Sequence, residues 1–374
     1  MFTYILKRIG FAIITLIIII FVVYILVALF SDNPFFIPPG EVPPPRTTSE
    51  IDNAVQNSIR AHFLAPGSTA TNRIPENVLT RFGYFVQSIF DPQQPFGQVF
   101  NPANLLGQRN IPALFFGNLR YTTIIVLPSF IVSSILGIML GVFAGYKRGK
   151  ILDTGINFFV VFFIALPSFI LAPIAIAITF FLKVAPSRFL QFDTPGQSMQ
   201  AVINSWITPI VVLTLVSLAS YTSYTRNQVI TVLTSNYVLI AKSKGLGKGS
   251  IFFKYVLRNI SIPLASMLIP SYILLLSGSI VIEQFWNVPG SSRVIVQSFP
   301  NHEINIIMFN IVFFTALSIF TTILVDVSFV LLDPTIKYAQ ASQYNVLKFA
   351  KSYMMRKKNI NAINQAAMTA KIGG

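Results

Sequence analysis

The chain contains no cysteine and only two histidines among its 374 residues. The absence of cysteine excludes disulfide bonds and thiolate metal sites, and it leaves the redox compartment open. His62 and His302 stand far apart in polar stretches, and no group of His, Asp and Glu has the spacing of metal ligands. We therefore expect neither a metal centre nor another bound cofactor.

Charge is also scarce, because Asp, Glu, Lys and Arg make up only 10% of the residues. A soluble domain carries about 25%. Hydrophobic residues make up 53%, and the mean hydropathy is +0.68. The long uncharged runs are rich in Ile, Leu, Phe and Val, and they lack the alternation of strands in membrane barrels. This composition predicts an all-α polytopic membrane protein.

Six runs are long enough to cross a bilayer, whose apolar core needs about 20 residues of helix. Several contain a proline, which membrane helices tolerate because neighbouring groups satisfy the freed carbonyl oxygens. We expect simple kinks at these prolines. The predicted transmembrane helices are residues 9–30, 121–144, 154–182, 203–221, 262–284 and 304–332.

Basic residues are concentrated on one side of the predicted membrane. With six crossings both termini share a side, which holds 18 of the 27 basic residues but only Asp153 and Asp333 as acids. The positive-inside rule makes this side cytoplasmic. We therefore expect a multi-pass protein of the plasma membrane with both termini in the cytoplasm. Because the charges are scattered over separate loops, they indicate contact with anionic lipid and not with nucleic acid. The 18 residues are Lys7, Arg8, Lys147, Arg148, Lys150, Arg226, Lys242, Lys244, Lys248, Lys254, Arg258, Lys337, Lys348, Lys351, Arg356, Lys357, Lys358 and Lys371.

Two hydrophilic regions flank the predicted core at residues 120–332. The insert, residues 31–119, follows the first span and begins with a Pro-rich run at residues 38–45. Its mixed middle part, residues 49–89, is compatible with short helices. We expect an extracytoplasmic cap or partner contact, with a partly flexible loop as the alternative. The basic tail, residues 333–374, follows an Asp-Pro helix stop, and we expect it to rest on the cytoplasmic lipid surface.

The basic segment, Tyr221–Pro263, contains no acidic residue. Ser235 or Asn236 is placed to cap a short helix with its side chain. Gly245 is placed to end that helix in a left-handed conformation, and a second helix begins near Ser250. Two interpretations fit this pattern. One is an amphipathic hairpin that lies on the lipid headgroups. The other is a rigid corner that docks into a cytoplasmic partner.

The glycines of the basic segment superficially suggest a phosphate-binding loop. A Walker A loop requires the pattern G-x-x-x-x-G-K-[ST]. Lys242 occupies the first glycine position relative to Gly247, and Gly249 follows Lys248 where Ser or Thr is required. The sequence therefore predicts no ATP site in this chain, so energy must come from a separate subunit.

At these residues the chain resembles a family. Ala241-x-x-x-Gly245 matches the second half of the EAA loop of ABC importer permeases, which docks into a cytoplasmic ATPase. Further pieces resemble the dipeptide/oligopeptide/nickel branch and its B-type subunit, so peptide and nickel–chelate substrates stay open at this point. These pieces are Tyr224-Thr225-Arg226, Tyr237-Val238, Leu257-Arg258-Asn259-x-x-x-Pro263, Tyr4-Ile5-Leu6-Lys7-Arg8, Glu283 with Pro289-Gly290, and Leu331-Leu332-Asp333-Pro334-Thr335-Ile336-Lys337-Tyr338.

The resemblance implies a type I ABC importer permease fold with a coupling loop at residues 222–261. It implies a non-catalytic permease subunit of an oligopeptide or dipeptide importer. The implied partners are a second, C-type permease subunit, two ABC ATPases, an extracytoplasmic substrate-binding protein and the peptide. Leu239-Ile240 replaces the Glu-Ala of the family loop, so we expect a more apolar ATPase contact. The implied ATPase-coupling residues are Asn236, Tyr237, Ala241, Lys242, Lys244, Gly245, Leu246 and Arg258.

Ionisable residues inside membrane spans are functional candidates by default. Asp326 lies near the cytoplasmic end of the last span. We expect it to form an ion pair with basic residues nearby, such as Lys337, and a transport role is the alternative. Glu283 stands beside Trp286 at the outer mouth, as a gate, a partner contact or an interfacial anchor. A stripe of small polar residues on the fifth span suits close helix packing or the lining of a pathway. The pathway or gate candidates are Ser277, Ser279, Glu283 and Trp286.

Two other functions stay open. A secondary transporter or channel would need ion-coupling acids or matching broken repeats, and apart from Asp326 the spans lack such acids. A membrane scaffold or receptor would need no ATPase partner. Dependence of uptake on ATP or on an ion gradient distinguishes the first alternative, and co-purification of an ATPase distinguishes the second.

Overall fold

The computed structural model describes residues 2–36, 47–192, 194–332, 349 and 351–360. Regular structure in these residues is helical, apart from an isolated antiparallel bridge between Leu64 and Pro75. Five stretches are long and apolar enough to cross a membrane: Leu6–Phe30, Ile111–Tyr146, Met199–Leu233, Lys248–Phe285 and Ile304–Phe329. The predicted all-α membrane fold is confirmed, whereas the Pro-rich run and most of the predicted tail lie outside the described residues.

The most extensive helix pair is α4 (Ile111–Tyr146) with α7 (Met199–Leu233). Three glycines of α4, each four residues after the last, face α7: Gly137 lies against Tyr221, Gly141 against Thr225 and Gly145 against Val229. Small residues let membrane helices approach closely, where packing replaces the hydrophobic effect as the driving force. The residue numbers of α4 and of α7 increase in the same direction along this contact, so the two helices run parallel.

The predicted third span, residues 154–182, is two helices and not one. The helices α5 (Ile151–Ala165) and α6 (Ser168–Leu182) meet at an angle of 102°. Leu166 is extended (φ −89°, ψ 108°), which the following Pro167 favours by steric exclusion of the helical region. Since α4 and α7 are parallel, the chain must return to its starting side between them. Counting this bent pair as the return gives six crossings.

Two helix boundaries also differ from prediction. The helix α4 begins at Ile111, ten residues before the predicted span, because the Asn110 side chain accepts a hydrogen bond from the Ala113 amide (3.0 Å). The helix α7 continues to Leu233, twelve residues beyond its predicted end. The first part of the basic segment is therefore helix and not loop.

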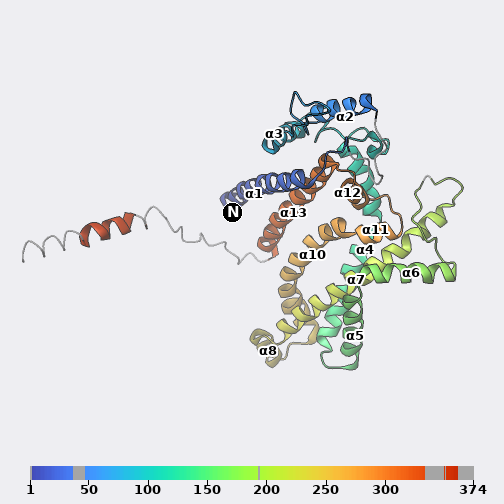
Figure 1. Cartoon of the computed structure of the whole chain (residues 1–374). Helices are drawn as coiled ribbons and strands as arrows, with labels where there is room; N and C mark the ends of the chain where they lie inside the picture. Colours follow the sequence, from blue (N-terminus) through green and yellow to red (C-terminus); the bar gives the residue numbers. More distant parts are fainter. Residues whose placement is uncertain (1, 37–46, 193, 333–348, 350, 361–374) are drawn as a thin grey trace, which may run out of the picture.

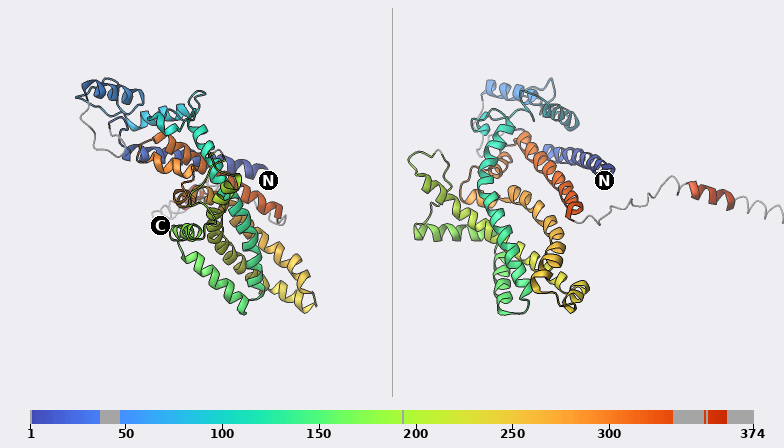
Figure 2. Two further views of the ribbon diagram at one scale, coloured as in Figure 1. Left: turned by 90° about the vertical axis from the view of Figure 1, so that its right-hand side faces the viewer. Right: turned by 180° about the vertical axis from the view of Figure 1, so that it is seen from behind.

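The insert contains α2 (Thr48–Arg60), α3 (Val78–Ile89) and a 3₁₀ turn, Pro102–Leu105. The short helices predicted for its middle part are therefore present. A capping box joins Thr47 and Glu50 at the start of α2. In Figures 1 and 2 these helices form a layer at one end of the molecule, and α8 lies at the opposite end. We call these the insert end and the α8 end.

A buried glutamate holds the insert on α13 (Ile304–Leu332). Glu303 is fully buried and accepts hydrogen bonds from the amides of Phe100 (3.0 Å) and Asn101 (2.8 Å) and from the side chain of Asn104 (2.8 Å). Burial raises the pKa of Glu303, and these hydrogen bonds oppose the rise. Tyr24 of α1 (Phe2–Phe30) stacks on Phe85 of α3 at a ring distance of 5.0 Å. The described part of the insert is thus packed on both α1 and α13.

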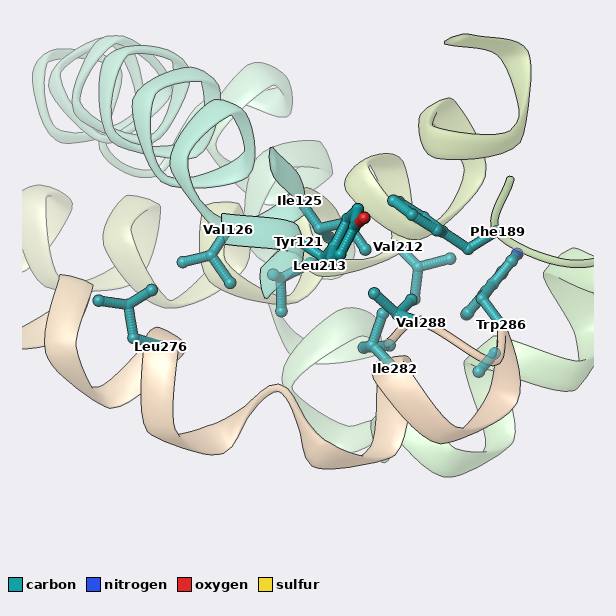
Figure 3. Close-up of a cluster of buried hydrophobic side chains, with 11 residues drawn as sticks. Tyr121, Ile125, Val126, Phe189, Val212, Leu213, Leu276, Ile282, Trp286 and Val288 are labelled. Atoms are coloured by element: carbon teal, nitrogen blue, oxygen red, sulfur yellow. The ribbon is translucent and has the colours of Figure 1, made fainter. Parts of the chain in front are cut away.

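The core at the junction of the helices is drawn in Figure 3. It joins α4, α6 and α7 with α10 (Arg258–Gly278) and α11 (Ile280–Phe285). Trp286 lies at one edge of this cluster with no exposed surface, beside Phe189, whose amide donates to the Trp286 carbonyl oxygen (2.7 Å). Trp286, the residue that favoured an interfacial anchor at Glu283, is buried in this structure because the chain folds back over it.

Candidate functional site

The basic segment forms a corner of helices at the α8 end. After α7 ends, α8 (Asn236–Ser243) begins with Ser235 in the N-cap position. The Ser235 hydroxyl donates backward to the Val232 carbonyl oxygen (2.6 Å), so the predicted side-chain cap is absent. The predicted start of this helix is confirmed, but the predicted hydrogen bond between a capping side chain and a free backbone amide is not formed.

The helix α8 has two apolar faces. Val238 and Ala241 are buried against the molecule. Tyr237, Leu239 and Ile240 are exposed, by 43%, 51% and 56% of their surface. An exposed apolar patch beside basic residues is typical of a protein or membrane contact.

A Schellman motif ends α8 and explains the Ala241-x-x-x-Gly245 pattern. The Leu246 amide donates to the Ala241 carbonyl oxygen (3.2 Å), and the Gly245 amide donates to that of Lys242 (2.9 Å). Gly245 has φ +77°, the left-handed region that glycine adopts without steric cost, as predicted. Leu246 then packs against the cluster that contains Val238.

Replacing Gly245 by alanine is expected to destabilise this corner by about 1–2 kcal/mol, the cost of the left-handed conformation for a residue with a Cβ. The cost is conformational, because open space surrounds the position. Gly247→Ala is the matched control, since Gly247 also has open space but has φ −70°. Thermal unfolding of the purified chain measures both. Equal melting temperatures for the two variants would contradict the motif.

A continuous helical stretch follows the corner. It consists of α9 (Lys248–Ile251), a π-helical turn (Phe252–Leu257) and α10. Val256 and Ile260 are fully buried and pack with Val229 of α7 and Val238 of α8. The corner is therefore fixed to two membrane helices. The predicted second helix begins at Lys248, and its π turn was not predicted.

The predicted coupling residues divide into two groups. Ala241 is buried and Leu246 is half-buried, so they hold the corner in shape. The others present their surface to the outside: Asn236, Tyr237, Lys242, Lys244, Gly245 and Arg258.

A buried ion pair that sequence reasoning missed joins α5 to α7 near the α8 end. Arg226 donates from Nε to one oxygen of Asp153 (2.6 Å) and from Nη2 to the other (2.8 Å). The Gly149 amide adds a third hydrogen bond to the carboxylate (2.9 Å). Asp153 is only 3% exposed. This bidentate geometry is the strong form of an arginine–carboxylate contact.

Three of the four pathway or gate candidates are buried. Glu283 accepts hydrogen bonds from Ser279 (2.6 Å) and Thr122 (2.8 Å) on one oxygen and from the Ser292 amide (3.0 Å) on the other. Gly290 packs directly on the Glu283 carboxylate, so a Cβ there has no room. In this conformation Ser279, Glu283 and Trp286 form internal contacts and expose at most 2% of their surface.

Ser277 is the fourth candidate, and it lines an open cavity of about 490 Å³ between α10 and α13. Hydroxyl-bearing residues from both helices line this mainly apolar cavity, and most of their hydroxyl groups donate to carbonyl oxygens of their own helix. These hydroxyl-bearing residues are Ser271, Ser277, Ser318, Thr321 and Thr322.

Asp326 forms an ion pair, as predicted, but its partner is Arg8 of α1. Lys337, the partner named from the sequence, lies outside the described residues. No group of three or more His, Asp or Glu side chains within the described ranges is arranged to hold a metal ion.

Comparison with known proteins identifies similar chains. The oligopeptide transport system permease protein OppB of Mycoplasma genitalium is 31% identical over 373 residues, which cover 97% of this chain and 85% of the relative. OppB of Mycoplasma pneumoniae is 28% identical, covering 87% and 81%. The dipeptide transport system permease protein DppB of Bacillus subtilis is 28% identical, covering 89% and 97%.

A family model described as the binding-protein-dependent transport system inner membrane component matches residues 137–338. These residues include the glycine stripe of α4, the basic segment, Glu283 and Asp326. Since the match covers more than half of the 374 residues, the chain belongs to the family of binding-protein-dependent transport system inner membrane components.

Proposed function

We propose that this chain is a membrane-spanning permease subunit of an ATP-driven peptide importer. Its relatives are oligopeptide and dipeptide permease proteins, and the alignments with them extend over most of both chains. Dipeptides and longer peptides are the favoured substrates. The subunit does no covalent chemistry, and ATP hydrolysis belongs to separate ATPase subunits.

The observation that carries this proposal is the exposed apolar face of α8 on a rigid support. Tyr237, Leu239 and Ile240 are exposed on a helix whose opposite face, at Val238, packs against α7 and α10. An ATPase groove that covers this face would bury apolar surface and meet basic residues at its edge. The missing acidic residue of the family loop fits such an apolar contact.

The same packing supplies a route for force. A push on α8 would reach α7 and α10 through the cluster around Val256. The glycine stripe joins α7 to α4, and the Asp153–Arg226 pair joins α7 to α5. ATP binding would thus move several membrane helices together and change the access of a cavity shared with a second permease subunit.

The orientation and the partners follow from this proposal. The α8 end lies in the cytoplasm, the insert lies outside, and residues 333–374 form the cytoplasmic tail. The insert offers a surface to a substrate-binding protein. The cavity at Ser277 is the candidate portion of the pathway. Release of the buried contacts of Glu283 and Ser279, beside Trp286, would be part of gating.

Site-specific crosslinking tests the contact of α8. Because the chain has no cysteine, a single Lys242→Cys variant in native membranes reports only on that position. We expect a crosslink to a protein that mass spectrometry identifies as an ABC ATPase. The control is Asp52→Cys, an exposed position of α2 at the insert end, which should give none. If Lys242→Cys and Leu239→Cys both failed to reach an ATPase in membranes that retain the assembled transporter, the docking proposal would be wrong.

A further inference from the structure

A second cavity lies in the insert, at the opposite end from α8. Its volume is about 550 Å³, and α3, residues 60–63, residues 87–100 and the start of α13 surround it. Small-molecule sites are usually clefts of roughly 300–1,000 Å³. The cavity is therefore large enough for a ligand, and it is separate from α8 and from the cavity at Ser277.

A buried arginine lines this cavity. Arg81 is only 9% exposed, and its Cζ lies 4.2 Å from the centre of the Phe63 ring. Burial lowers the pKa of Arg81, and the Tyr24 phenol is the main group that opposes this shift. The guanidinium stays charged, because arginine is not deprotonated in proteins.

In the part of the chain that the structure describes, no salt bridge joins this arginine to a carboxylate, although Glu76 attracts it from a longer distance. The ion pairs found there join Arg8 to Asp326 and Arg226 to Asp153. Burial removes several kcal/mol of hydration from the Arg81 charge, and Tyr24, Glu76 and the Phe63 ring offset only part of this loss, because the net effect on Arg81 is still a lowered pKa. An anionic ligand would return part of it through charge-assisted hydrogen bonds.

The other residues that line the cavity indicate which chemical groups the rest of such a ligand would carry. Tyr84 and Phe100 supply aromatic surface, and the His62 ring stacks on Tyr84 at 3.5 Å. Burial lowers the pKa of His62, which disfavours the charged form of this ring. The acidic residue of the lining is Asp91, which is exposed and accepts a hydrogen bond from the Gln93 amide (2.8 Å).

We propose that this cavity binds a small carboxylate that carries an apolar or aromatic group, with Arg81 as the partner of the carboxylate. One buried guanidinium balances one negative charge, and its planar fork matches the two oxygens of a carboxylate. The rings of Phe63, Tyr84 and Phe100 cover the apolar part. Arg60, at the exposed rim of the cavity, attracts the anion from solution. This site lies within the insert and its support on α1 and α13, and it does not depend on what the chain transports.

Binding to the full-length chain in lipid nanodiscs tests the site. The probes are N-acetyl-phenylalanine and its amide, which differ only in the carboxylate, measured by isothermal titration calorimetry. We expect the acid to bind about tenfold to a hundredfold more tightly than the amide, as hydrogen bonds to a charged group require. Excess inorganic phosphate should not displace it.

Two variants locate the binding. Arg81→Gln should remove the preference for the acid. Arg73→Gln should retain it, because Arg73 is exposed over Phe36 in the same insert but outside the cavity. If Arg81→Gln does not fold, Arg60→Gln serves instead and should weaken binding of the acid but not of the amide. Equal binding of acid and amide, no binding of either, displacement by phosphate, or a preference unchanged in the Arg81 or Arg60 variant would overturn the proposal.

Discussion

Replacing Gly141 by leucine is expected to break the packing of α4 against α7 and to prevent accumulation of folded protein. Even a single Cβ at this position would lie 2.5 Å from the Thr225 Cβ and 2.7 Å from the Thr222 carbonyl oxygen. Because one of these atoms is backbone, a rotamer change gives no relief and the helices must separate. Overpacking usually costs about 1–3 kcal/mol, and we expect a loss above this range.

The matched control is Gly155→Leu on α5, where a Cβ meets no atom within 4 Å. Both variants place the same side chain at a helical glycine in a membrane-embedded region. Thermal unfolding in detergent and the yield of monodisperse protein compare them. The close approach of α4 and α7 would be refuted if Gly141→Leu were as stable as Gly155→Leu.

Replacing Arg226 by methionine is expected to destabilise the chain by about 3–5 kcal/mol, the typical loss when one partner of a buried ion pair is removed. Asp153 would remain 97% buried with hydrogen bonds from Gly149 and Asn157 but without a counter-ion. The stability is lost because the Asp153 carboxylate stays buried without its partner. The loss should therefore be visible in thermal unfolding and in weaker packing of α5 on α7.

A double variant shows whether the stability is lost because the Asp153 charge is unpaired or because Arg226 has been replaced at all. Asp153→Asn with Arg226→Met removes both charges and should recover much of the lost stability. Lys254→Met is the surface control, because Lys254 is exposed, and it should change stability by less than about 0.5 kcal/mol. Additive losses in the double variant would show that the pair does not act as a unit.

Membrane helices were largely predictable because length and hydropathy are local properties of the sequence. The break between α5 and α6 was not. Pro128, Pro209 and Pro270 all stand inside continuous helices, whereas Pro167 stands at a bend of 102°. The packing of neighbouring helices decides which proline bends the chain, and the sequence of one span does not contain that information.

The corner at Gly245 was predictable for the same local reason, since a left-handed glycine ends a helix without help from distant residues. The Asp153–Arg226 pair was not, because 73 residues separate its partners. The four-residue spacing of Gly137, Gly141 and Gly145 is visible in the sequence and signals a close helix contact. The sequence does not show which helix packs against these three glycines.

The sequence predicts Glu283 at the outer mouth, because this residue follows the apolar run of the fifth span and stands beside Trp286. In the structure the turn at Gly290 carries the chain back, and the Ser292 amide at the start of α12 (Ser291–Ser298) closes on the carboxylate. Thr122 of α4 completes the enclosure. These three contacts come from separate elements, so the sequence alone could not distinguish a buried carboxylate from an exposed gate.

The most direct test of the proposed function is the energy source of uptake. Uptake of a labelled peptide is measured in cells that hold the complete transporter, once after ATP depletion and once with a proton ionophore at constant ATP. We expect uptake to stop when ATP is depleted and to continue when only the proton gradient is removed. Uptake that followed the gradient and ignored ATP depletion would contradict the assignment of this chain to an ATP-driven importer.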